Sequence, residues 1–175
     1  RGLGDVYKRQ EYKGFTYLIQ ASKLLDGRFL IYITGTGELT EKLHEEANDD
    51  KKVVFTGRID DMELKALILA SDIFCFPSIT KNEAFGLALA EGMYYGKPAV
   101  TFTIPGSGVN YVSINGETGI EVENRNVKKY AEAMKKLADD AELREKYGDA
   151  GRKRVEENFL STQFCENARR MFSRL

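Results

Sequence analysis

The sequence contains little of what metal sites, disulfide frameworks or nucleic-acid surfaces need. Among its 175 residues are two cysteines, one histidine, three prolines and no tryptophan. The cysteines and the histidine share no metal-ligand spacing and no Asp-x-Asp sequence occurs, so we expect no metal site. Acidic and basic residues nearly balance at a net charge of −1, which gives no electrostatic case for nucleic acid.

Long apolar runs are also missing. No run approaches the roughly 18 residues that a membrane-spanning helix needs, and no signal-peptide pattern is present. Cys75 lies in a short apolar run and is interpreted as a small core residue, which fits a reducing cytosol. We therefore expect a cytoplasmic protein. The basic residues at 152–154 and 169–174 are interpreted as solvated faces, with weak peripheral contact to anionic lipid at the inner membrane face as the alternative.

The sequence does contain short apolar runs alternating with helical patterns. Strands are predicted at Phe29–Ile33, Val53–Phe55, Ile73–Phe76, Ala99–Phe102 and Ile120–Val122. Helices are predicted over 15–25, 39–48, 61–70 and 85–96, and throughout the chain from Asn126 onward. This alternation is typical of βαβ crossovers, so we expect an α/β fold with a Rossmann-like parallel sheet covered by helices on both faces.

The chain has the length and composition of one soluble globular domain, which we place at residues 10–160. Residues 1–9 have neither helical nor clear strand periodicity. We interpret them as an atypical N-terminal segment, with a sequencing scar as one explanation. Residues 161–175 are loosely amphipathic and predict a C-terminal helix.

The region between Pro77 and Pro98 carries the strongest chemical pattern. It reads as the end of a strand, a polar loop and a helix in which the only charged residue is Glu91. An unpaired buried carboxylate is costly, so Glu91 either points to water or meets hydrogen-bond donors. Glu83 lies eight positions earlier, in the loop.

The predicted helix start between these two acids suits an anion. Its unpaired amides and the positive end of the helix dipole favour a phosphate, and Gly86 lets a ligand approach the backbone. A phosphate seat flanked by two carboxylates matches a nucleotide-sugar, whose diphosphate joins a ribose to a sugar. The alternative is a buried helix covering the sheet with its one charge at the rim. Residue types alone favour neither.

Several further polar or glycine-rich loops follow predicted strands. They are Gly35-Thr-Gly37, Gly57-Arg58, Ser78 to Glu83 and Pro105-Gly-Ser-Gly108. Ligands of open parallel sheets bind beyond the carboxyl ends of the strands, so these loops predict one binding rim.

At this point the motifs resemble a known family. Glu83-Ala-Phe-Gly, the seven residues between Glu83 and Glu91, and Gly-Lys-Pro at 96–98 resemble the signature of retaining GT-B glycosyltransferases of the family-4 type. Lys13-Gly14 and Asn115-Gly116-Glu-Thr-Gly119 match in the same order, and the resemblance runs from about Tyr12 to the C-terminus. It implies the C-terminal, donor-binding half of a GT-B fold, with the first strand missing or replaced.

The resemblance also assigns roles to residues. It implies that Glu83 is the catalytic-site carboxylate that meets hydroxyls of the transferred sugar, while Glu91 holds the ribose and Lys13 the diphosphate. Amides at Phe85, Gly86 and Leu87 would face the phosphates. Gly35, Gly37 and Arg58 complete the expected donor-binding set, and no cofactor or metal is implied. Asn110 departs from the family pattern, in which a glutamate often follows the glycine-rich loop.

The implied activity is hexosyl transfer, with retention, from a nucleotide diphosphate sugar to a saccharide or lipid-linked acceptor, as in polysaccharide biosynthesis. The acceptor site would lie on the missing N-terminal GT-B domain, so we expect this fragment to be inactive alone. Two alternatives stay open. One is a non-catalytic nucleotide-binding or interaction module, and the other is a GT-B nucleotide-sugar epimerase, which would need further acids and a histidine around the cleft.

Overall fold

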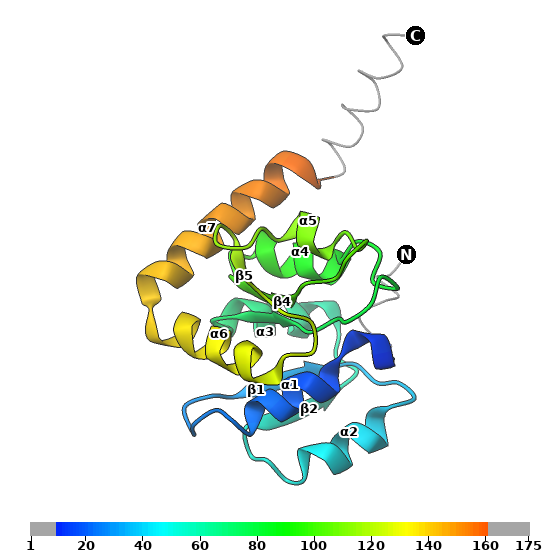
Figure 1. Cartoon of the computed structure of the whole chain (residues 1–175). Coiled ribbons are helices and arrows are strands. Elements are labelled where there is room, and N and C mark those ends of the chain that lie inside the picture. Colours follow the sequence, from blue (N-terminus) through cyan, green and yellow to red (C-terminus); the bar gives the residue numbers. More distant parts are fainter. Residues whose placement is uncertain (1–9, 161–175) are drawn as a thin grey trace.

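A computed structural model describes residues 10–160 (Figure 1). The predictions made for residues 1–9 and 161–175, and for Cys165, lie outside the described residues. Within them the five predicted strands all form and all their pairings are parallel. The strands are β1 (Ile31–Thr34), β2 (Val53–Gly57), β3 (Phe74–Phe76), β4 (Ala99–Phe102) and β5 (Gly119–Val122).

The helices alternate with the strands as predicted. They are η1 (Glu11–Lys13), α1 (Phe15–Ser22), α2 (Thr40–Ala47), α3 (Asp61–Ala70), α4 (Leu87–Tyr94), α5 (Val109–Val112), α6 (Val127–Asp139) and α7 (Ala141–Asn158). The short η1 and α5 were not predicted. The helix predicted over 15–25 ends earlier, at Ser22, and the chain then turns before β1.

The parallel sheet is divided in two. β1 pairs with β2, and β4 lies between β3 and β5 in a second sheet. No strand of residues 10–160 lies between β1 and β3, and a cavity of about 640 Å³ is lined there by residues of both strands. The expected Rossmann-like α/β fold is therefore confirmed. The hydrogen-bond ladder is broken between β1 and β3. The sequence predicts that the first strand of the GT-B half is missing or replaced, and no strand of residues 10–160 precedes β1.

Helix packing connects the two sheets. α1 packs against both α2 and α6, and α6 in turn packs against β4 and β5 (Figure 1). Tyr130 of α6 is fully buried, its hydroxyl donates to the Val100 carbonyl at 2.8 Å, and its ring lies 4.7 Å from that of Phe102. On another side, α4 packs against β3, β4 and α7.

Two helix ends follow from local sequence. Asp60 with Glu63 three residues later is a capping-box pattern, and in the structure the Asp60 side chain accepts from the Glu63 amide while the Glu63 side chain accepts from the Asp60 amide at the start of α3. After α4, Gly96 adopts the left-handed conformation at φ 73° and its amide donates to Met93. Glycine tolerates this conformation without strain, and the chain can therefore turn sharply into β4.

The basic residues of α7 were predicted to be solvated, and for Arg154 this is wrong. Its guanidinium donates to the Val112 carbonyl at 3.0 Å and to the Tyr111 carbonyl at 2.5 Å, and so caps the C-terminal end of α5. Arg152 is exposed but donates to the Tyr94 carbonyl at the end of α4. Lys153 is exposed, as predicted.

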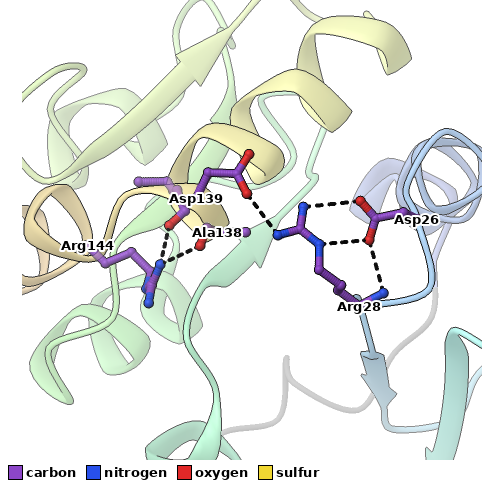
Figure 2. A network of polar contacts seen from close by, with 6 residues as sticks. Asp26, Arg28, Ala138, Asp139 and Arg144 are labelled. Carbon is purple, nitrogen blue, oxygen red and sulfur yellow. Dashed lines mark hydrogen bonds and ion pairs between the residues drawn. The ribbon is translucent and has the colours of Figure 1, made fainter.

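A second polar network lies where α6 meets the loop before β1 (Figure 2). The Arg28 guanidinium donates to Asp26 and also to Asp139 at the end of α6. Arg144 donates to the carbonyls of Leu137 and Ala138, which are among the last of α6. Arg28 precedes β1, so this network is at the amino ends of the strands, and Arg28 and Arg144 line that end of the cavity between β1 and β3.

Two single residues were noted in the sequence. Cys75 lies in β3, where it is partly buried and packs against the core, and burial raises the pKa of its thiol to about 12. His44 is exposed on α2, with its ring 3.9 Å from that of Phe55. No helix within residues 10–160 has the length and apolarity to cross a membrane.

Candidate functional site

The site is built around a buried carboxylate. Lys13 Nζ donates to Glu83 Oε2 at 2.6 Å, and Ser78 Oγ donates to the same oxygen at 3.2 Å. All three residues are buried, with exposed fractions of 8% for Lys13, 6% for Glu83 and 1% for Ser78. Because both bonds end on Oε2, Oε1 is left without a hydrogen bond from the described residues. Oε1 is therefore an available acceptor at a fixed position.

The Lys-Gly pair explains how a lysine reaches this place. Gly14 has φ 66°, and a Cβ built there would lie 2.0 Å from the Pro77 carbonyl oxygen. Only glycine permits that approach. Beside it, the Ile79 amide donates to the Tyr12 carbonyl at 2.9 Å. The turn between η1 and α1 is thus held against the end of β3, and Lys13 points at Glu83.

The start of α4 offers unpaired amides. Gly86 is the N-cap with φ 89°, and no side chain caps the helix. The amides of Phe85, Gly86 and Leu87 have no acceptor among the described residues. The side chain of Leu87 is exposed, whereas the Phe85 ring packs at 5.4 Å on Phe159. These amides and the positive end of the helix dipole can therefore bind an anion.

Glu91 lies in the middle of α4 and is half-buried. Burial raises the pKa of its carboxyl, and the charge of Asp61 raises it further. Glu91, Lys13 and Ser78 line the same cavity between β1 and β3. The structure thus places Lys13 and Glu91 on one cavity, from η1 and α4, while Glu83 is not part of its lining and is joined to it through Lys13 and Ser78.

The remaining predicted donor residues lie elsewhere on the rim, after β1 and β2. The Gly35 amide donates to the Gly57 carbonyl at 2.7 Å, and the Gly37 amide donates to Thr40 Oγ1 at 3.0 Å. Both amides are therefore used within the protein, as in a tight turn, and are not available to a ligand. Arg58 is exposed beyond the end of β2. None of these three residues is among those lining the cavity with Glu91.

Sequence reasoning missed two polar residues that hold the loop of Glu83. Ser78 binds the Glu83 carboxylate, and Ser107 Oγ donates to the Glu83 carbonyl from the loop after β4. Both serines lie in loops that the sequence places on the predicted binding rim, but the pattern assigned no role to either. Asn110, noted for departing from the family pattern, accepts from the Ile104 amide at 2.7 Å and donates to the Phe102 carbonyl at 3.0 Å.

Comparison with known proteins agrees with this geometry. Residues 6–154 match the family model of glycosyl transferases group 1. The chain is 34% identical over 152 residues to the D-rhamnosyltransferase WbpZ of Pseudomonas aeruginosa, covering 86% of this chain and 39% of WbpZ. It is 38% identical to the capsular polysaccharide biosynthesis glycosyltransferase CapM of Staphylococcus aureus, covering 98% of this chain and 45% of CapM.

A solved structure shares the fold. The Anabaena protein HepE in complex with UDP superposes with a TM-score of 0.86 at 19% identity, over 96% of this chain and 47% of HepE. The chain spans less than half the length of these relatives. The family match covers most of the chain, from before Lys13 to beyond Glu91. This chain therefore belongs to the glycosyl transferases group 1 family.

Proposed function

We propose that this chain is the nucleotide-sugar-binding half of a retaining glycosyltransferase that transfers a hexose to a saccharide or lipid-linked acceptor. The observation that carries the proposal is the fixed Glu83 carboxylate, with one oxygen held by Lys13 and Ser78 and the other available. A sugar hydroxyl is a suitable donor for that oxygen. The names of the relatives support the substrate class, since WbpZ is a D-rhamnosyltransferase and CapM is a capsular polysaccharide biosynthesis glycosyltransferase.

The diphosphate of the donor would bind at the start of α4. There the unpaired amides of Phe85, Gly86 and Leu87 would meet the phosphate oxygens, and the helix dipole would stabilise charge developing on the leaving diphosphate. Lys13 already neutralises Glu83, and its ammonium has further N–H donors for a phosphate. One cation would thus serve both the acid and the leaving group.

Glu91 would accept bonds from the ribose hydroxyls. Its carboxylate is half-buried at the cavity and carries a desolvation cost that neighbouring side chains do not relieve, since the nearby acid Asp61 repels it. Hydroxyl donors from a ligand would lower that cost. Gly35, Gly37 and Arg58 would border the base from the rim of β1 and β2.

A ligand titration tests the donor site. The chain is titrated with UDP, GDP and ADP by calorimetry, as wild type and as Glu91→Ala. We expect at least one nucleotide to bind and the substitution to weaken it by about tenfold or more, the value of lost hydrogen bonds to a charged group. Glu132→Ala, which removes an exposed carboxylate of α6, is the matched control and should bind like wild type.

Two outcomes would contradict the proposal. If wild type and Glu91→Ala bind alike, Glu91 does not hold the ribose. If wild type binds no nucleotide at all, the donor-binding role itself is wrong. The epimerase alternative gains no support, because the histidine of the chain stacks on Phe55 and is absent from the cavity lining. The other alternative, a non-catalytic nucleotide-binding or interaction module, makes a different prediction. Such a module would transfer no sugar even when joined to the amino-terminal part of a glycosyltransferase.

A further inference from the structure

Residues 77–86, which carry Glu83, contain neither helix nor strand and depend on contacts from elsewhere for their position. Lys13 and Ser78 hold the tip of the Glu83 side chain, but they do not fix the main chain from which it projects. A carboxylate that must meet one sugar hydroxyl needs both its side-chain tip and its main chain to be fixed. Misplacement by about 1 Å is enough to lose such a contact.

The Glu83 amide donates within the segment, to the Thr80 carbonyl, whereas the carbonyls of Glu83 and Ala84 are bound by the loop after β4. Ser107 Oγ donates to the carbonyl of Glu83, and the Gly108 amide donates to the carbonyl of Ala84 at 2.8 Å. The approach is close, since a Cβ built at Gly108 would lie 2.7 Å from the Ala84 oxygen. Two consecutive carbonyls, one of them that of Glu83, are therefore bound by two consecutive residues of another loop.

That loop is itself fixed by Asn110. Its amide side chain accepts from the Ile104 amide at 2.7 Å and donates to the Phe102 carbonyl at 3.0 Å, joining the first turn of α5 to the end of β4. Ser107 also accepts from the Val109 amide at 3.2 Å, which orients its hydroxyl toward Glu83. Hydrogen bonds thus connect the main chain of Glu83, through the loop of Ser107 and Asn110, to the end of β4, the central strand of the β3–β4–β5 sheet.

We propose that Ser107 is a positioning residue for the donor sugar. It acts through Glu83, and Asn110 maintains the loop that presents it. This inference rests on the proposed donor site and adds a specificity role to it. Ser107 would contribute to recognition of the sugar and not to recognition of the nucleotide, because its bond ends on Glu83 and not on the α4 amides or Glu91.

The test compares ligands with and without the sugar. Wild type, Ser107→Ala and Ser107→Thr are titrated with UDP and UDP-glucose, and with GDP and GDP-mannose. For Ser107→Ala we expect the ratio of nucleotide-sugar affinity to nucleotide affinity to fall about tenfold, with nucleotide affinity unchanged. Ser107→Thr keeps the hydroxyl and should restore the ratio. A merely structural role would weaken both ligands equally, and that result would overturn the inference.

A matched control and a ligand-free measurement complete the design. Ser22 Oγ donates to the Ile19 carbonyl at 2.7 Å, and Ser22 does not line the cavity, so Ser22→Ala removes a bond of the same kind elsewhere and should leave the ratio unchanged. Thermal melts of Ser107→Ala, Glu83→Gln and the double variant form a cycle. We expect the double variant to lose less than the sum of the single losses, whereas Ser22→Ala with Glu83→Gln should be additive.

The outcomes separate the two proposals. If wild type binds none of the four ligands, the proposed function fails, and the thermal cycle alone decides whether Ser107 positions Glu83. If wild type binds but the ratio does not change in Ser107→Ala, the positioning role fails and the donor site stands. Additive losses in the Ser107 and Glu83 cycle would also overturn the positioning role.

Discussion

At the scale of single residues, the environment of Glu91 disfavours its charged form and so lowers the stability of the folded protein. We expect this of a carboxylate that serves binding. Burial raises the pKa of its carboxyl above the ordinary value of 4.5, so the folded state favours the protonated form. Stability should therefore fall as pH rises through the ordinary pKa toward the raised one, and the penalty should persist at neutral pH.

Glu91→Gln should remove this penalty. We predict a higher melting temperature than wild type at pH 7 and no difference well below pH 4.5, where the wild-type carboxyl is protonated in both the folded and the unfolded state. The same variant should bind nucleotide more weakly at pH 7. Melting curves followed by circular dichroism at the two pH values provide the measurement. An equal shift at both would show that the effect is one of packing and not of charge.

Lys13 and Glu83 form the one ion pair among residues 10–160 in which both side chains are almost fully buried, at 10% and 8% exposed. Lys13→Met should cost about 3 kcal/mol in urea unfolding, because it leaves a buried carboxylate without its counter-charge. Lys129→Met, in an exposed pair with Glu123, is the control and should not change the unfolding midpoint measurably. Similar effects in the two variants would mean that water reaches Glu83 freely.

At the scale of elements, the contact between α7 and the end of α4 depends on one glycine. A Cβ built at Gly148 would lie 2.1 Å from the Gly96 carbonyl oxygen, whereas one built at Gly151 would meet Met93 no closer than 3.6 Å. The two glycines share a helix and differ only in the space around them.

Alanine substitutions at these glycines should have opposite signs. Gly148→Ala should destabilise by about 1–3 kcal/mol through overpacking against backbone that cannot yield. Gly151→Ala should stabilise by up to about 1 kcal/mol, the gain in helix propensity. Thermal unfolding of the two variants beside wild type measures both. Stabilisation by both would indicate that α7 does not pack against Gly96 in solution.

Elements were more predictable from sequence than the contacts between them. The bounds of α3 follow from Asp60 and Glu63, because a capping box is a local pattern read within a few residues. The partner of Lys13 lies 70 positions away and that of Ser107 lies 24 positions away. Such pairs depend on the order of the strands in the sheet, and the periodicity of apolar residues does not predict that order. Family resemblance indicated Lys13 and Glu83 separately, but not that they bind each other.

At the scale of the whole molecule, the division of the sheet sets what the described residues hold together. No hydrogen-bond ladder of residues 10–160 joins β1 to β3, so the two sheets are connected by packing of α1 on α6 and by contacts such as Arg28 with Asp139 (Figures 1 and 2). Lys13 and Glu83 also face each other near this break. The candidate site thus lies beside the break between the two sheets, and ligand binding there would add connections between them.

We expect this chain alone to bind a nucleotide without transferring a sugar. It spans 39% of WbpZ and 45% of CapM, and a transferase must hold donor and acceptor together for the reaction to occur. We predict that the chain alone binds a nucleotide, with a rise in melting temperature that grows with ligand concentration, and transfers no sugar to any acceptor tested. Product formation, followed with radiolabelled donor, would contradict this. Joining the chain to the amino-terminal part of a group 1 relative should then produce transfer that Glu83→Gln abolishes, and failure of that variant to reduce transfer would remove Glu83 from the reaction.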